Sequence, residues 1–138
     1  MPPDPVRLAD VKSWLSRASA DMRAAEHGMT AEPPLVGDVL FHTQQVVEKC
    51  FKGFLAWHDV PFRKTHSLEE LGELCLSIDR SLESVVERAV PLTEYAWKFR
   101  YPGVYEDPSP DEATESLAVV EAVWTAVVVR LPEKARPT

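Results

Sequence analysis

The chain has 138 residues, of which 45% are hydrophobic and 27% are charged, with a formal net charge of -7. This length favours a single domain with a sizeable core. The acidic balance argues against a general nucleic-acid coat, because such a protein neutralises many phosphates with Lys and Arg. A small basic site on an acidic body stays compatible with it.

The sequence indicates a protein of a reducing compartment. Its first ten residues, MPPDPVRLAD, lack the charged segment and apolar run of a signal peptide. No apolar run approaches the roughly 18 residues that a membrane span needs. Cys50 and Cys75 lie among apolar residues, and we interpret them as buried free thiols. We therefore predict a cytoplasmic protein with no membrane partner.

Helical periodicity predicts the first two elements. Apolar residues recur at helical spacing over about residues 8–26, and Gly28 is expected to end that helix. Pro33 and Pro34 mark a short connection. A second helix is predicted over about residues 35–58, because Pro61 opposes its continuation.

Capping signals predict the middle of the chain. Ser67 followed by Glu70 forms a capping box, which opens a third helix to about residue 78. Asp79 or Ser81 is expected to cap a fourth helical segment. Pro91 either kinks this segment or starts a new helix at its first turn. The helical pattern is expected to continue until the breakers at positions 102 and 103.

The last helix opens at Ser109, with Pro110 at its first position and Glu112 completing a capping box. Its apolar residues recur at alternating spacings of 4 and 3, which is an a/d seam. The seam consists of Ala113, Leu117, Val120, Trp124, Val127 and Leu131. We predict an all-α, up-and-down bundle of about five helices. It forms one domain over residues 1–138, with disordered tails at 1–7 and 133–138.

The second helix carries a polar stripe opposite its apolar face. His42, Gln45, Lys49 and Lys52 are spaced 3, 4 and 3 apart and therefore align along one side. A plain surface helix usually mixes Glu and Lys, so this composition favours contact with an anion. The alternative is a solvated helix face that is basic by chance.

Two other basic segments can join the stripe. One is the loop from Arg63 to His66, and the other is Arg100–Tyr101 at the end of the fourth segment. If the second and fourth helical segments lie side by side, Arg100 can face the stripe and bind a phosphate with its planar guanidinium. Tyr101 or Trp97 can then stack on a base.

Structural roles compete with this interpretation. Arg100 can cap helix carbonyls or pair with Glu48, and His66 can hold its loop through a backbone hydrogen bond. The four His are scattered without metal-binding spacing, and neither a P-loop nor a nucleophile signature occurs. We expect no metal, no cofactor and no catalytic residue.

Three motifs in order resemble the HEPN domain (higher eukaryotes and prokaryotes nucleotide-binding). They are FHTQQVVEKCFKGFL at 41–55, THSL at 65–68 and FRYP at 99–102. The resemblance covers nearly the whole chain. It implies a bundle of about five helices, often a homodimer, commonly encoded beside a minimal nucleotidyltransferase as a toxin–antitoxin pair.

The resemblance does not carry over an activity. Many HEPN proteins are metal-independent ribonucleases with an Arg-x(4–6)-His motif, in which His is the acid/base and Arg stabilises phosphate charge. In this chain no His follows Arg100, or any other Arg, at that spacing.

Three functions are therefore weighed. We favour a non-catalytic nucleotide-binding or partner-binding protein, paired with a nucleotidyltransferase. Its predicted site consists of His42, Gln45, Lys49, Lys52, His66, Arg100 and Tyr101. The second is a ribonuclease that uses His42 or His66 with Arg100, within one subunit or across a dimer interface. The third is an interaction module whose partly exposed last-helix seam pairs with its own copy or a partner.

Overall fold

The structure is a computed structural model in which residues 3–99, 102–103 and 105–137 are described. Every regular element in these ranges is helical, so the predicted all-α bundle of about five helices is confirmed. The α-helices are α1 (Pro5–Thr30), α2 (Val36–Trp57), α3 (Leu68–Ile78), α4 (Glu83–Ala89) and α5 (Pro110–Val128). Short 3-10 helices are η1 (Arg80–Leu82), η2 (Val90–Ala96) and η3 (Glu133–Ala135).

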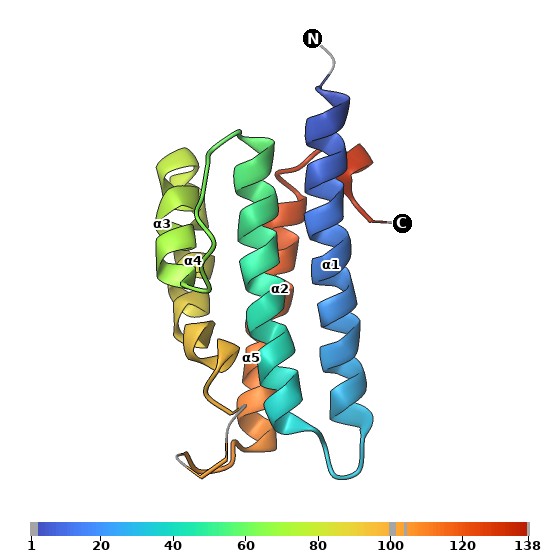
Figure 1. Ribbon diagram of the computed structural model, residues 1–138, viewed down its shortest axis with the longest axis vertical. Coiled ribbons are helices and arrows are strands. Elements are labelled where there is room, and N and C mark those ends of the chain that lie inside the picture. The colour runs from blue at the N-terminus through green and yellow to red at the C-terminus, as the bar shows by residue number, and fades with distance from the viewer. Residues whose placement is uncertain (1–2, 100–101, 104, 138) are drawn as a thin grey trace.

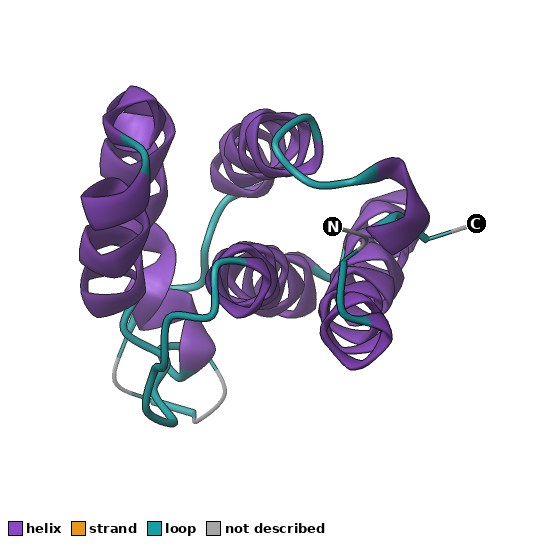
Figure 2. Cartoon of the chain, turned by 90° about the horizontal axis from the view of Figure 1, so that it is seen from above, coloured by secondary structure: helices purple, strands orange, loops and turns teal. Residues whose placement is uncertain are grey.

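Helix α2 occupies the middle of the bundle. It contacts α1, α3, η2 and α5, with α1 on one side and α3 and α4 on the other (Figure 1, Figure 2). Because α2 has neighbours on several sides, its polar residues Thr43, Gln44, Glu48 and Lys52 are buried together with its apolar ones. Buried polar groups need hydrogen-bond partners, and this requirement governs the site described below.

The main apolar core joins all five α-helices. Its largest buried side chains include Phe51 and Phe54 of α2, Leu15 of α1 and Leu71 of α3. A smaller cluster joins α1, α2 and α5 through Ala25, Val39, Leu40 and Ala113. No helix in the described ranges is long and apolar enough to cross a membrane.

The predicted helix starts at Ser67 and Ser109 are confirmed. The Ser67 hydroxyl accepts a hydrogen bond from the Glu70 amide at 3.2 Å, and the Ser109 hydroxyl accepts one from the Glu112 amide at 3.2 Å. Asp79 caps η1 in the same way through the Ser81 amide, at 3.0 Å. Side-chain capping of this kind satisfies amides that have no partner within the helix.

The predicted helix end at Gly28 is wrong. Helix α1 continues to Thr30, and Gly28 lies inside it, fully packed against α2. A Cβ atom at position 28 would lie only 2.8 Å from Cγ2 of Val39. Gly28 is therefore required for the close approach of two helices, whereas the prediction assigned it to a cap.

Two other boundaries differ from the prediction. The fourth segment does not stay α-helical, because Pro91 lacks an amide hydrogen, and residues 90–96 form η2. The expected tails are partly ordered. Residues 5–7 form the first turn of α1, which Asp4 caps through the Val6 amide at 2.9 Å. Residues 133–135 form η3, in which Ala135 is buried.

The a/d seam of α5 faces the core of its own subunit. Ala113, Val120 and Val127 are fully buried, while Leu117 and Trp124 are partly buried and pack against the apolar clusters. Helix α5 itself ends at Val128, before the last seam residue. The interaction-module hypothesis assumed a partly exposed seam, and within α5 only Leu117 and Trp124 of the seam keep partial exposure.

The contact at Gly28 makes a testable prediction. Gly28→Ala should lower the free energy of unfolding by about 1–3 kcal/mol, because the added methyl group overlaps Val39. Gly37→Ala is the control, since a Cβ there meets its nearest neighbour at an ordinary 3.6 Å. Urea denaturation measures both. Equal stability of the two variants would contradict the close-approach role.

Candidate functional site

The connection between α2 and α3 brings distant residues together. After α2 the chain reverses at Asp59, whose φ of 55° is in the left-handed region. The Val60 amide donates to the Leu55 carbonyl at 3.0 Å, which secures this turn. The connection then runs back along α2 (Figure 1). As a result His66 lies beside the middle of α2 rather than beyond its end.

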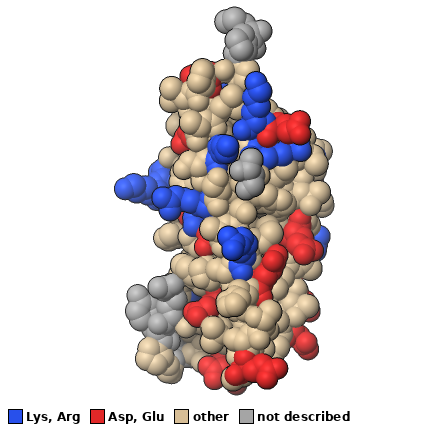
Figure 3. Space-filling model, turned by 90° about the vertical axis from the view of Figure 1, so that its right-hand side faces the viewer, with Lys and Arg blue, Asp and Glu red and all other residues tan. Residues whose placement is uncertain are grey.

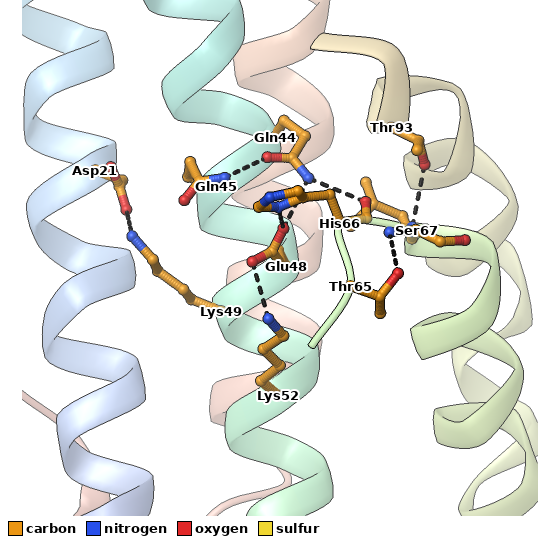
Figure 4. Close-up of polar contacts among 11 residues, drawn as sticks. Asp21, Gln44, Gln45, Glu48, Lys49, Lys52, Thr65, His66, Ser67 and Thr93 are labelled. Carbon is orange, nitrogen blue, oxygen red and sulfur yellow. Dashed lines mark hydrogen bonds and ion pairs between the residues drawn. The ribbon is translucent and has the colours of Figure 1, made fainter. Parts of the chain in front are cut away.

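The central feature of the site is the carboxylate of Glu48. Its Oε1 accepts hydrogen bonds from Nδ1 of His66 at 2.8 Å and from Nε2 of Gln44 at 3.1 Å. Its Oε2 accepts from Nζ of Lys52 at 3.0 Å. The side chain of Glu48 is 5% exposed and that of Lys52 is 10% exposed. Figure 4 shows these four side chains as one network.

This network keeps Glu48 ionised. Burial is the largest influence on its pKa and would raise it, but the hydrogen bonds from His66, Gln44 and Lys52 together lower the pKa below the ordinary 4.5. An ionised carboxylate only accepts hydrogen bonds, so the proton between it and His66 belongs to Nδ1 of the imidazole. In the neutral imidazole the free lone pair is therefore on Nε2.

Lys52 is enclosed on its other sides by aromatic rings. Its ammonium lies 5.5 Å from the ring centre of Trp14 and 5.9 Å from that of Phe62. Favourable cation–π contacts of this kind add to the ion pair with Glu48. The structure thus places Lys52 inside the fold, away from the exposed stripe in which it was predicted.

A second carboxylate binds two residues of the stripe. Asp21 of α1 accepts from Nδ1 of His42 at 2.8 Å and forms an ion pair with Nζ of Lys49. The side chain of Gln45 donates to that of Gln44 at 2.6 Å and so links the two networks. The predicted stripe is therefore divided: His42 and Lys49 contact Asp21 of α1, whereas Gln45 and Lys52 bond to side chains of α2 itself. Figure 4 shows the contacts of Gln45, Lys49 and Lys52.

Sequence reasoning missed the acceptors Asp21 and Glu48 as site residues, and Gln44 with them. A signal existed for two of them, because Gln44, Glu48 and Lys52 follow one another at i, i+4 spacing on one helix. No local signal could identify Asp21, which is 21 and 28 residues away from its partners.

The remaining predicted residues form a more exposed rim. The side chain of His66 is 69% exposed, that of His42 is 31% exposed and that of Lys49 is 18% exposed. Lys64 is exposed as well, and Arg63 forms an ion pair with Glu70 at 2.8 Å. These side chains can meet a ligand from solvent, which the buried ammonium of Lys52 cannot do without rearrangement.

Arg100 and Tyr101 lie outside the described residues. The ribonuclease alternative, which needs Arg100, therefore stays a prediction. The neighbouring Trp97 is exposed, with its ring centre 6.0 Å from that of Tyr105. Among the described residues no group of three or more His, Cys, Asp or Glu is placed to hold a metal ion.

Charge is distributed unevenly over the side of the molecule on which α1 lies. Lys and Arg side chains gather over the upper and middle parts of this face, whereas Asp and Glu lie along one edge and the lower end (Figure 3). The exposed cations of α1 include Lys12, Arg17 and Arg23. A net charge of -7 thus coexists with a locally basic surface.

The network predicts a stability loss for Lys52→Met. Met keeps the apolar stem between Trp14 and Phe62, but Glu48 loses one of three donors while it stays buried. The free energy of unfolding should fall by about 1–3 kcal/mol at neutral pH, as measured by urea denaturation. Lys49→Met is the matched control, because Asp21 keeps His42. A Lys52→Met protein as stable as the control would refute the structural role.

Glu48 also predicts a pH dependence. Its folded-state pKa is lowered, so its contribution to stability is present above the ordinary value of 4.5 and is lost as pH falls through the folded-state pKa. Between about pH 5 and pH 3, Glu48→Gln should therefore lose stability less steeply than the original chain. Glu70 and Asp79, whose pKa values are also lowered, are common to both proteins. Identical slopes would contradict the prediction.

Comparison with known proteins gives one match. A family model of the HEPN domain matches residues 11–132, which include α2, the connection to α3 and the whole Glu48 network. No curated protein and no solved structure matches the chain. The matched range covers most of the chain, and the helical architecture agrees with this family. The chain therefore belongs to the HEPN domain family.

Proposed function

We propose that this HEPN protein is the non-catalytic member of a two-component pair with a minimal nucleotidyltransferase, in the manner of a toxin–antitoxin system. Membership of the family supports a nucleotide-binding, RNA-binding or partner-binding module in general. The pairing itself comes from the family resemblance. The observation that favours a binding face over a scaffold is the exposed His66, which a buried carboxylate holds at 2.8 Å.

The proposed binding face is the rim around the Glu48 network. It consists of Lys64 and His66 on the connection, with Gln45 and Lys49 on α2. These groups supply hydrogen-bond donors and positive charge, which a phosphate requires. Because Asp21 already neutralises part of this charge, the face suits a single nucleotide or a short RNA segment better than a long polyanion.

A homodimer is part of this proposal and rests on the family resemblance. The seam of α5 gives it no support, because its residues pack within the subunit. Several apolar side chains of the described residues are exposed, among them Val6, Leu35 and Val129. They do not identify which surface would form the dimer. Oligomeric state is therefore a separate measurement from ligand binding.

A thermal-shift experiment tests the binding face. ATP, GTP and a short single-stranded RNA are each added at rising concentration. A ligand at about 100 times its dissociation constant adds about 2.7 kcal/mol, which raises the melting temperature by several degrees. The shift should disappear in a Lys64→Ala/His66→Ala double variant and persist in Lys12→Ala, which removes an exposed cation of α1 that is not part of the proposed rim.

The pairing is tested by co-expression with a minimal nucleotidyltransferase, if the genome encodes one beside this chain, followed by light scattering of the purified material. A stable complex that the Lys64→Ala/His66→Ala variant weakens would place the partner on the same rim. Absence of both a ligand shift and a complex would reject the proposed function.

A further inference from the structure

The imidazole of His66 combines two properties that are seldom found together. Its side chain is 69% exposed, yet its Nδ1 is held at 2.8 Å by a carboxylate that is 5% exposed. An exposed His usually samples several rotamers, and a His that is bound to a buried carboxylate is usually buried itself. This ring is therefore presented to solvent in a fixed orientation, over α2 beside Gln45 and Glu48 (Figure 4).

The backbone around the ring is fixed as well. Nε2 of Gln44 donates to the His66 carbonyl at 3.3 Å. The Ser67 amide donates to the Thr65 hydroxyl at 3.0 Å, and the Ser67 hydroxyl caps α3. The Leu68 amide donates to the Thr93 hydroxyl at 3.1 Å. The orientation of the imidazole thus depends on three elements of the bundle, α2, α3 and η2.

The hydrogen bond to Glu48 determines which ring nitrogen can react. Nδ1 carries the proton, so Nε2 carries the lone pair on the exposed side of the ring. A carboxylate at the opposite nitrogen increases the electron density of the ring and stabilises positive charge on it. Nε2 of His66 therefore has the character of a nucleophile.

The surroundings favour an anionic electrophile. Lys64 is exposed and forms no ion pair with the described residues, and Arg63 lies next to it. His66 also directly precedes Ser67, the N-cap of α3, where the helix dipole favours negative charge. Besides Glu48, the nearby carboxylates are Glu70, which is paired with Arg63, and Glu69, which points toward solvent in the first turn of α3.

The exposure of the ring argues against a self-contained catalytic site. Such a site works by excluding water and surrounding the reacting atoms with oriented groups, and a ring that is 69% exposed has no such enclosure. A residue that accepts a group from another molecule needs the opposite property, because the donor must reach it.

We propose that His66 is a phosphoryl-acceptor residue that reacts through Nε2. The lone pair of Nε2 attacks the phosphorus atom of a phosphoramidate donor, a new N–P bond forms, and the donor's own P–N bond breaks. The leaving nitrogen takes up a proton from water and departs as an amine. The ring becomes an imidazolium whose Nδ1 proton stays on the hydrogen bond to Glu48, and that carboxylate balances the charge. No oxidation or reduction occurs.

The other histidines provide internal controls. His27 and His58 are exposed, but neither makes a hydrogen bond to a carboxylate of a described residue. His42 has such a hydrogen bond, to Asp21, but its side chain is only 31% exposed. His66 alone among the four combines exposure above one half with a carboxylate partner in the described structure.

The test uses potassium phosphoramidate on the full chain, with phosphorylated positions quantified by mass spectrometry at alkaline pH and the bonded nitrogen assigned by phosphorus NMR. The rate constant at His66 should exceed those at His27 and His58, and the product should form only at Nε2. In Glu48→Gln the rate at His66 should fall to the level of His27. Glu87→Gln, which changes an exposed carboxylate of α4 outside the site, should leave the rate at His66 unchanged.

Three outcomes overturn the proposal. They are a rate at His66 no higher than at His27, a product on Nδ1, and a folded Glu48→Gln protein with an unchanged rate. The comparison among histidines and the position of the phosphoryl group are measured on the unsubstituted chain, so they decide the matter even if Glu48→Gln does not fold. Nucleotide binding at the rim is measured separately and can succeed or fail without affecting this result.

Discussion

A buried negative charge organises the centre of this protein. The carboxylate of Glu48 would be unstable inside the bundle without several donors, because an ion loses its hydration when it is buried. Gln44 and Lys52 supply two donors from the same helix, one turn before and one turn after Glu48. The third donor, His66, comes from outside α2. The connection after α2 must therefore return along that helix, and the position of α3 depends on this return.

The same principle explains why a basic stripe exists on an acidic protein. Asp21 and Glu48 each take up cationic partners from α2 or its connection, so much of the positive charge in the sequence pattern is used inside the molecule. What stays available to a ligand is a rim of partly exposed groups around two satisfied carboxylates. A ligand that binds there finds side chains already oriented, which reduces the entropy lost on binding.

Apolar periodicity and capping chemistry were enough to predict the bundle, because burial of apolar faces dominates helix placement and because caps such as Ser67 and Ser109 are local. The prediction failed where contacts between different helices determine the role of a residue. From the sequence alone, Gly28 was interpreted as the end of a helix. In the structure it allows α1 to approach Val39 of α2 closely. The seam of α5 resembles a dimer interface until α2 and α4 are placed against it.

The sequence could indicate a polar stripe on α2, but not the residues Asp21, Glu48 and Gln44 that contact it or the geometry of these contacts. Helical spacing places His42, Gln45, Lys49 and Lys52 on one side of α2, yet it carries no information about what covers that side. Asp21 contacts His42 and Lys49 of the stripe from α1, and His66 contacts Glu48, next to the stripe, from the connection. Both contacts join residues far apart in the sequence, which spacing within one helix cannot reveal.

Two of the three motifs that carry the family resemblance meet in the structure. Gln44, Glu48 and Lys52 belong to the motif on α2, His66 belongs to the motif before α3, and all four meet at one carboxylate. The need to stabilise the buried carboxylate of Glu48 explains why Gln44, Lys52 and one further donor lie around it, without reference to any ligand. It does not explain why the third donor is a histidine with an exposed second nitrogen, since a backbone amide or a Ser hydroxyl would satisfy Glu48 equally well. Function is therefore to be sought at Nε2 of His66.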